Sequence, residues 1–409
     1  MAANTHGLPV INLADPVMFT NPFPVYRGLR QSNPVVWVRS QSTPRGGYLV
    51  TRYDDVMMLH TDERFSTDIV RWGGMGLITK ILPRAFRLLF TESMVFKDDP
   101  DHKRLRGLVN KVFTPKVVQQ MSDDVEKIVN QLLDNLAAKS HVDLVADFAV
   151  PLPLEVISSL LGIGEGDRKD FHSWVERLTE SASSPVGLPR ALPAANKLMR
   201  LFEKLVADAK RQPNDGLISS LVRAREADDR LSDQELVGMI FLLLLAGHDT
   251  TSNLIGSGTL ALIDNPDQLA LLRQKPELID SAVEELLRFT SPVTSGAARY
   301  AREDVQIAET SIPRGSPILG MLISANRDDA VFSDPEVLDI ARDENRHLAF
   351  AFGAHFCLGN RLARLEGKLA LQGLLQRFEG FELTAPRDSL TYKKTQSLRG
   401  LRALPLRLT

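Results

Sequence analysis

The chain contains a single cysteine, and the residues around it could hold a metal ion. Gly353 stands four residues before Cys357 and Gly359 two residues after it, so the backbone can pass close to a flat ligand without an intervening side chain. The leucines that follow recur at helical spacing, which predicts a helix beginning just after the sulfur. A helix start favours the thiolate, so Cys357 is a candidate metal ligand, although a lone cysteine is more often inert packing.

A second polar cluster interrupts the longest apolar run, residues 239–246. The tract Ala246–Thr251 reads AGHDTT and sits in the middle of a predicted helix. In a buried helix a glycine costs about 1 kcal/mol relative to alanine, and an unpaired carboxylate costs considerably more. The tract therefore marks a helix break, a satisfied buried polar pair, or a place where function outweighs stability.

Two pairs of charged residues stand at helical spacing. His102 and Arg106 are four residues apart near the start of a predicted helix, so they lie on one face and could grip one anion together. Glu285 and Arg288 are three residues apart in a helix predicted over 278–289. A solvated charge run is the default for the first pair, and surface ion pairs like the second contribute little to stability.

The elements that must position these residues are mostly helical. Periodicity predicts further helices over 116–136, 142–161, 165–180, 194–211 and 229–263. Strand patterns predict a hairpin of 35–38 with 47–51, a sheet segment of 305–307 with 317–321, and a C-terminal hairpin over 390–407. Residues 181–193, rich in Ser, Pro and Gly, predict a mobile loop.

The composition is that of a globular protein with a large core. Of the 409 residues, 44% are hydrophobic and 24% charged, and length alone would suggest two or three domains. Lysine and arginine total 49 against 51 aspartates and glutamates, so no attraction to nucleic acid is expected. One cysteine cannot form an internal disulfide, residues 1–12 lack a signal-peptide pattern, and the apolar run is too short to span a bilayer. We therefore expect a cytoplasmic protein without a transmembrane segment.

The segment around the cysteine resembles the haem-binding loop of the cytochrome P450 family, Phe-Gly-x-x-x-x-Cys-x-Gly. Phe352, Gly353, Cys357 and Gly359 match it, and Ala354 stands where a glycine is commonest. The resemblance covers almost the whole chain and implies a single P450 domain over 1–409, mainly α with small β-sheets. It also implies haem b as cofactor, with Cys357 as the axial thiolate ligand of the iron, electron-rich enough to favour O–O cleavage.

The same resemblance assigns the tract in the long helix to oxygen activation. It implies that Ala246 and Gly247 open a groove for dioxygen. Thr250 would donate a hydrogen bond there, and Asp249 would relay protons from solvent. His248 occupies a variable position of the motif and is expected to make a structural or solvent-side contact.

Further residues receive roles from the resemblance alone. Glu285, Arg288 and Arg342 would form a buried structural network that holds the cysteine loop. The residues implied for the haem propionates are His102, Arg106, Arg299 and His355. The residues implied for the substrate pocket are Val293, Thr294, Ala297 and Leu398.

The function implied is that of a bacterial-type monooxygenase that hydroxylates or epoxidises a hydrophobic or amphiphilic small molecule. Its electrons would come from a ferredoxin and an NAD(P)H–ferredoxin reductase, since no flavin or iron–sulfur segment is recognisable. Residues 69–91 and 181–202 lack acids and carry basic residues among apolar ones. They are either basic stems lying over apolar surface or a mouth that attracts an anionic amphiphile or a membrane surface. Fatty acids and other amphiphiles are the first substrate hypothesis, with terpenoids, steroids and macrolides next.

Three alternative functions use the same residues. A peroxide-driven peroxygenase would not need the proton relay, so Asp249 and Thr250 argue against it. A haem-thiolate protein that binds or senses without oxygenase activity would yield no NAD(P)H-coupled product. A cysteine hydrolase would need a His or Asn partner motif for Cys357, and none is recognisable.

Overall fold

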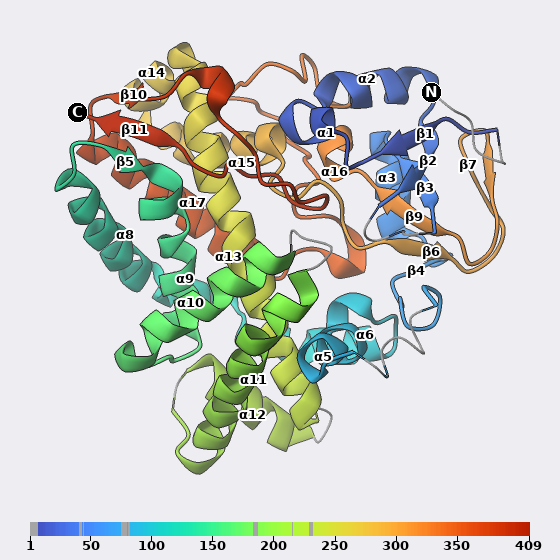
Figure 1. The fold of residues 1–409 in the computed structure, drawn as a ribbon, viewed down its shortest axis with the longest axis horizontal. Coiled ribbons are helices and arrows are strands. Elements are labelled where there is room, and N and C mark those ends of the chain that lie inside the picture. Colours follow the sequence, from blue (N-terminus) through green and yellow to red (C-terminus); the bar gives the residue numbers. More distant parts are fainter. Residues whose placement is uncertain are drawn as a thin grey trace. The chain divides into compact units, whose positions relative to one another are not determined.

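The computed structural model describes residues 7–40, 43, 45–74, 80, 82–182, 187–214, 216–228 and 232–409. They form two compact units. The first comprises Met1–Ser66, Val125–Leu152 and Thr250–Thr409, and the second comprises Thr67–Asp124 and Pro153–Asp249. Both consist mainly of helices, and the strands form small sheets, so the predicted fold class is confirmed (Figure 1). The assignment of 1–409 to a single domain stays a prediction.

The largest sheet belongs to the first unit. Its strands, in spatial order, are β1 (Val10–Asn12), β2 (Val35–Arg39), β3 (Gly47–Val50), β9 (Pro317–Gly320), β6 (Arg299–Ala301) and β4 (Phe65–Ser66). β2 and β3 pair antiparallel, which confirms the predicted hairpin. Gly46, at a φ of +94°, closes the turn, and a Cβ there would collide with the ring of Trp37.

Two smaller sheets complete the strands of this unit. β7 (Val305–Ile307) pairs with β8 (Thr310–Ile312), so the predicted pairing of 305–307 with 317–321 is wrong. The backbone turns back at Ala308, at a φ of +48°, before the chain can reach 317. β10 (Phe381–Leu383), β11 (Pro405–Leu408) and β5 (Val142–Asp143) form the other sheet. The C-terminal hairpin is present around the bridge between Tyr392 and Leu401.

Within the ranges described, seven α-helices lie wholly within the first unit, where they pack on the largest sheet and form a separate apolar core. They are α1 (Pro16–Thr20), α2 (Phe23–Ser32), α3 (Tyr53–Thr61), α14 (Pro266–Gln274), α15 (Ile279–Thr290), α16 (Leu322–Ala325) and α17 (Asn360–Arg377). α15 and α17 pack with residues 254–262 into an apolar core that reaches Cys357. α17 approaches closely at Gly367, where a Cβ would lie 3.0 Å from Cδ2 of Leu254.

The second unit is built from helices. These are α5 (Arg84–Glu92), α6 (Asp101–Val112), α7 (Pro115–Gln120), α10 (Glu165–Ala182), α11 (Gly187–Arg211) and α12 (Leu217–Asp228). The loop predicted over 181–193 is wrong for residues 187–193, because α11 already begins at Gly187 and contains Pro193. Burial of Ala191 and Ala194 on either side of that proline offsets its cost to the helix. Residues 183–186, and 75–79 and 81 of the other basic tract, lie outside the described residues.

Three helices run across the boundary between the units in sequence: α8 (Ser122–Ala137), α9 (Pro151–Leu160) and α13 (Asp233–Asp264). The predicted helix 116–136 is divided into α7 and α8, and the predicted helix 142–161 is a strand, a π-helical turn over Val145–Ala149, and α9. α13, with 32 residues, is the long helix expected (Figure 1). Ser232 and Glu235 exchange capping hydrogen bonds at its start, at 3.1 and 2.7 Å. In the described part of the chain, no helix combines the length and apolarity needed to cross a bilayer.

Candidate functional site

The cysteine loop places a sulfur at the edge of an apolar core. Cys357 is partly exposed and packs against the core formed by α13, α15 and α17. Its backbone N–H donates to the carbonyl of Phe350 at 2.9 Å, and its carbonyl accepts from Nδ2 of Asn360 at 2.7 Å. α17 begins at Asn360, which confirms the helix expected just after the sulfur. The position of the sulfur is therefore fixed by backbone hydrogen bonds on both sides.

The two glycines of the loop serve different purposes. Gly353 has a φ of +70°, and a Cβ there would collide with the carbonyl oxygen of His60 on α3. Only glycine fits that position. A Cβ at Gly359 would meet no protein atom within 4 Å, so the protein itself does not require glycine there. The open space beside Gly359 is available to a ligand.

A carboxylate on α15 joins the two ends of this loop. Glu284 accepts hydrogen bonds from Nε and Nη2 of Arg364 at 2.6 and 2.8 Å, and its Oε2 lies 3.1 Å from Nε2 of His347. Burial opposes ionisation, but the bonds from Arg364 and His347 lower the pKa of Glu284 to about 2. Arg364 also stacks on the ring of Phe350, 4.4 Å from its centroid. We call Glu284, His347 and Arg364 the loop clamp. Sequence reasoning missed it, because its members are far apart in the chain.

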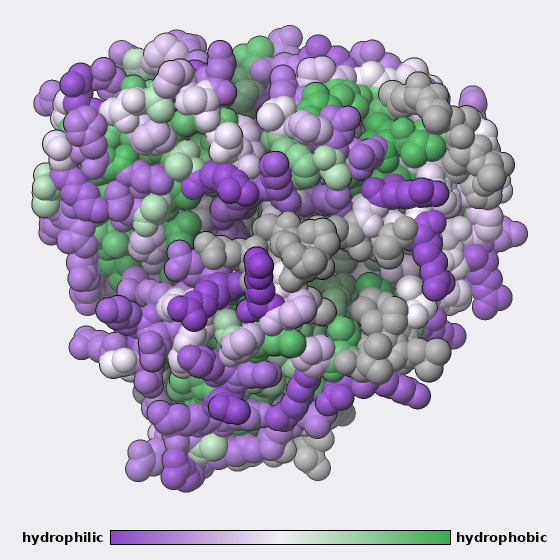
Figure 2. All heavy atoms as spheres, in the orientation of Figure 1, coloured by the Kyte–Doolittle hydropathy of each residue, from purple (hydrophilic) through white to green (hydrophobic). Residues whose placement is uncertain are grey.

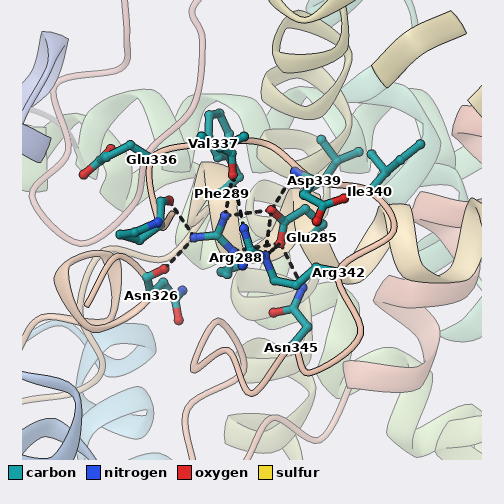
Figure 3. A network of polar contacts seen from close by, with 12 residues as sticks. Glu285, Arg288, Phe289, Asn326, Glu336, Val337, Asp339, Ile340, Arg342 and Asn345 are labelled. Carbon is teal, nitrogen blue, oxygen red and sulfur yellow. Dashed lines mark hydrogen bonds and ion pairs between the residues drawn. The ribbon is translucent and has the colours of Figure 1, made fainter. Parts of the chain in front are cut away.

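The neighbouring carboxylate, Glu285, lies at the centre of the predicted structural network (Figure 3). It accepts both Nε and Nη2 of Arg288 at 2.7 Å, and Nε of Arg342 at 3.2 and 3.3 Å. The backbone N–H of Asp339 and Nδ2 of Asn345 each donate to it at 3.0 Å. The side chains of Glu285 and Arg288 are both fully buried. Without water, each charge is stabilised only by its ion-pair and hydrogen-bond partners.

Arg288 carries this network onward to the segment that precedes the cysteine loop. Its guanidinium donates to the carbonyls of Asn326, Pro335 and Val337 at 2.8–3.1 Å. The side chain of Asn326 in turn accepts the N–H of Leu348 at 2.6 Å. The expected contacts among Glu285, Arg288 and Arg342 are thus present, and the network ends nine residues before Cys357.

The AGHDTT tract lies where the exposure of α13 changes. Residues 251–262 are buried, whereas Ala246 is exposed and Leu242 and Leu243 are partly exposed. His248 is buried, and its Nε2 lies 3.7 Å from Oδ2 of Asp249. The tract does not break the helix. It combines an accessible apolar strip with a polar pair, as a site for a small apolar ligand next to a proton donor requires.

The residues around Cys357 fit a flat, largely apolar group that is ligated by one sulfur. Phe352 has a large apolar side chain that is 43% exposed beside the loop. The space at Gly359 is open. Across the described ranges, no group of three or more His, Cys, Asp or Glu side chains is placed to hold a metal ion by itself. A haem with a thiolate ligand fits the exposed Phe352 ring and the open space at Gly359, and its porphyrin itself supplies four nitrogen ligands to the iron.

The family model described as cytochrome P450 matches residues 80–399 of the chain. The chain belongs to the cytochrome P450 family. Curated relatives agree: the polyketide biosynthesis cytochrome P450 PksS of Bacillus subtilis is 40% identical over 395 residues, which is 95% of this chain and 96% of PksS. The 6-deoxyerythronolide B hydroxylase of Saccharopolyspora erythraea is 38% identical over 388 residues, or 94% of this chain and 95% of the hydroxylase. This P450 is therefore a monooxygenase.

Solved structures give the same result for the fold. The structure of Bacillus subtilis PksS superposes with a TM-score of 0.89 over 97% of this chain and 99% of its own, at 40% identity. P450BioI, in complex with an acyl carrier protein ligated to hexadec-9Z-enoic acid, superposes with a TM-score of 0.85. That match covers 96% of this chain and 100% of P450BioI, at 33% identity.

The residues predicted for the substrate pocket of this P450 lie together in part. Val293 forms an antiparallel bridge with Leu398 at the tip of the C-terminal hairpin. The N–H of Thr294 donates to the carbonyl of Ser397 at 2.9 Å. Thr294 and Leu398 border a small recess that Tyr392 also lines. Ala297, partly buried, follows on the same segment just before β6.

The four residues predicted for the propionates of this P450 are divided between the two units. In the first, Arg299 is buried at the start of β6, and His355 ends a 3-10 turn over Gly353–His355. Burial, reinforced by the charge of Arg299, lowers the pKa of His60 to about 4 and keeps that neighbouring ring neutral. In the second unit, His102 is buried and Arg106 partly buried on α6. Their part in binding propionates stays a prediction.

A buried acid on α17 was also missed. Glu366 is 3% exposed, and its Oε2 has no hydrogen-bond partner among the described residues. Burial raises its pKa to about 8. At neutral pH this carboxyl is therefore protonated and can donate a hydrogen bond. An acid inside the apolar run that follows Cys357 was the signal that could have identified it.

Proposed function

We propose that this P450 inserts one oxygen atom of dioxygen into a C–H or C=C bond of a hydrophobic or amphiphilic small molecule, while the other atom leaves as water. The observation that carries the proposal is a single partly exposed cysteine, held by backbone hydrogen bonds, next to open space for a flat group. The haem b supplied there would provide the redox chemistry of oxygen activation.

The protein residues would hold the cofactor and manage protons. Cys357 would ligate the iron, and Phe352, Gly353 and Gly359 would shape the loop around it. The cations expected for the propionates are His102, Arg106, Arg299 and His355. On α13, the Asp249 carboxyl would take protons from solvent and pass them to the groove where dioxygen binds. The Thr250 hydroxyl would donate a hydrogen bond in that groove.

We infer a polyketide-derived or acyl substrate. The names of PksS and the 6-deoxyerythronolide B hydroxylase point to polyketides, and P450BioI binds a fatty-acyl carrier protein. The partly exposed apolar residues Val293 and Leu398 suit an aliphatic substrate. α11 adds an exposed basic face that carries Arg190, Lys197 and Arg200, which would favour an anionic substrate.

Electrons would come from a ferredoxin that is reduced by an NAD(P)H–ferredoxin reductase. The sequence has one cysteine, and an iron–sulfur cluster needs several. Lys103 and Lys111 are exposed on α6, where an acidic ferredoxin could dock. We infer that the protein works in the cytoplasm, because a reducing compartment keeps Cys357 from being oxidised.

The experiment is an absorption spectrum of the reduced protein under carbon monoxide. We expect a strongly red-shifted Soret band in the native protein and its loss in Cys357→Ser. A shifted band that survives in Cys357→Ser would overturn the ligand assignment. The matched variant Thr250→Ala should keep the band but yield less product per NAD(P)H in the presence of ferredoxin and reductase. Turnover driven by peroxide alone, far above that driven by ferredoxin, would instead favour a peroxygenase.

A further inference from the structure

The second unit contains a chain of ionisable groups that leads from its surface to Asp249. Glu155 lies on α9, His172 on α10, and His248 precedes Asp249 on α13. The side chains of Glu155 and His172 are 29% and 24% exposed, whereas that of His248 is 3% exposed. The chain therefore has one end at water and one end in the interior.

The hydrogen bonds of Ser158 fix the resting state of His172. Oγ of Ser158 is 2.6 Å from the carbonyl of Leu154, which can only accept, so the hydroxyl hydrogen is used there. Oγ is also 3.1 Å from Nε2 of His172 and must accept from it. The neutral ring consequently carries its hydrogen on Nε2, and Nδ1 is the atom that gains the second proton.

Nδ1 of His172 faces the surface end of the chain. It lies 3.9 Å from Oε1 of Glu155, whose other oxygen accepts from Nη1 of Arg168 at 2.9 Å. Burial lowers the pKa of His172, and Arg168 lowers it further, while Glu155 and a bond to the Leu154 carbonyl raise it. The ring thus rests neutral near pH 7 and can take up a proton transiently at its exposed edge.

His248 is oriented for the opposite step. Its Nδ1 is 3.2 Å from the carbonyl of Leu244, so the neutral ring holds its hydrogen on that atom. Nε2 is then the proton-accepting atom, and it lies 3.7 Å from Oδ2 of Asp249. A proton gained by Nε2 therefore faces the carboxylate that receives it.

The two histidines are electrostatically coupled. A positive charge on His248 lowers the pKa of His172. α9 links the elements that carry them: its Ser158 binds His172, and its Ile157 lies 3.8 Å from where a Cβ would stand at Gly247, next to His248. Like charges repel, so a proton on His248 disfavours a second proton on His172.

We propose that His172 and His248 form a two-histidine relay that carries protons from the Glu155–Arg168 surface to the Asp249 carboxylate. A proton binds Nδ1 of His172, and the hydrogen on Nε2 of that ring leaves. A water molecule carries this proton to Nε2 of His248, which then passes it to the Asp249 carboxylate. Both rings end neutral. His172 then carries its hydrogen on Nδ1, and it regains the resting tautomer when the ring rotates toward solvent, where Nε2 gains a proton and Nδ1 releases one. The relay rests on the function proposed above for Asp249. It gives His248 a positioning and transfer role in place of the structural or solvent-side contact expected from sequence.

Two glutamine variants test the relay. In His172→Gln and His248→Gln the side-chain amide still donates to Ser158 or to the Leu244 carbonyl, but it cannot carry a proton. We expect product per NAD(P)H to fall about tenfold in each, with the solvent isotope effect on turnover raised. Substrate binding, measured as the substrate-induced spectral shift, should be unchanged. His141→Gln, an exposed histidine outside the chain of groups, is the matched control.

A titration provides a readout that does not depend on activity. NMR of the histidine ring protons should show that His248→Gln raises the pKa of His172, because a repelling charge is lost. In the native protein, the yield of product per NAD(P)H should fall with rising pH over a range below the ordinary pKa of histidine. This pH-dependent fall should be absent in His172→Gln.

Two results would overturn the relay. The first is an unchanged pKa of His172 in His248→Gln. The second is a native yield of product per NAD(P)H in both glutamine variants while Asp249→Asn has a low yield. The second result would leave the proposed function intact. If even the native protein formed no product with any ferredoxin, the proposed function would fail, whereas the titration would still decide whether the two histidines are coupled.

Discussion

The two polar networks of this P450 differ in what their charges can do. Around Glu284 and Glu285, arginine nitrogens approach carboxylate oxygens to 2.6–3.3 Å, and the central pair is fully buried. Around His172, the contacts spread from 3.1 to 3.9 Å, and the groups stand partly in water. The first network is built on permanently charged arginines. The second centres on histidine rings and has an arginine–carboxylate pair, Arg168 with Glu155, at its surface end.

This difference separates support from proton transfer. Short bonds between permanent ions fix geometry, and loss of one partner leaves a buried charge uncompensated. Longer contacts of histidine rings make weak bonds that re-form with each proton. The network around Glu284 and Glu285 is therefore suited to holding a loop in one conformation. The network around His172 is suited to exchanging a proton at each turnover.

The largest effect is expected where the first network is fully buried. Arg288→Lys keeps a positive charge but loses the planar fork that reaches Glu285 and three carbonyls. We expect a loss of about 3–5 kcal/mol in the free energy of unfolding, measured by urea denaturation. Arg346→Lys, whose ion pair with Glu344 is exposed, is the matched control and should change little. A small loss in Arg288→Lys would contradict the idea that this network is permanent support.

Glu366 gives the opposite sign of pH dependence from an ordinary acid. Its pKa of about 8 in the folded state lies above its value in the unfolded chain. Its contribution is therefore fully present below about pH 4.5 and is lost as pH rises toward 8. Glu366→Gln should remove this fall and add about 2–4 kcal/mol of stability at pH 8 relative to the native protein. Thermal unfolding from pH 5 to 8 measures it. The exposed Glu379→Gln is the control, and parallel pH curves for all three proteins would refute the burial argument.

The loop clamp should fail in acid. The pKa of Glu284 is depressed to about 2 in the folded state, so its stabilisation is present above the unfolded value and is lost as pH falls toward 2. Because its side chain is 28% exposed, we expect Glu284→Gln to cost only about 1–2 kcal/mol at pH 7. The difference from the native protein should shrink below pH 4. A difference that persisted at pH 3 would mean that packing, and not charge, holds the loop.

The smallest effect is expected on the basic face of α11. Arg190 and Arg200 are exposed and make no ion pair in the described part of the chain. The face over α10 and α11 is largely hydrophilic (Figure 2). Reversing both charges to Glu should raise KM for an anionic substrate about threefold at low salt and leave kcat unchanged. The effect should disappear at 0.5 M salt. Lys275→Glu is the control, and an equal effect on a neutral substrate would exclude steering.

The sequence predicted those features of the fold and the site that depend only on residues close together in the chain. Cys357, the helix after it and the capping of α13 are all set within a few residues. What depends on distant partners was missed. Glu284 finds Arg364 eighty positions away, and the early start of α11 depends on burial of alanines beside Pro193. The pairing of β7 failed because a positive φ at Ala308 turned the chain early. Glu366 was missed because its burial results from packing in the folded protein.

The loop clamp also restricts the conformations that the segment around Cys357 can adopt. Since one carboxylate binds both His347 and Arg364, the residues between them form a closed ring, as a disulfide would make. A reducing compartment would cleave a disulfide, but it leaves an ion pair intact. Closure by charge limits the conformations of the ring in the folded protein. Such a closure depends on pH and needs no oxidant, so Cys357 can stay reduced inside a cross-linked loop.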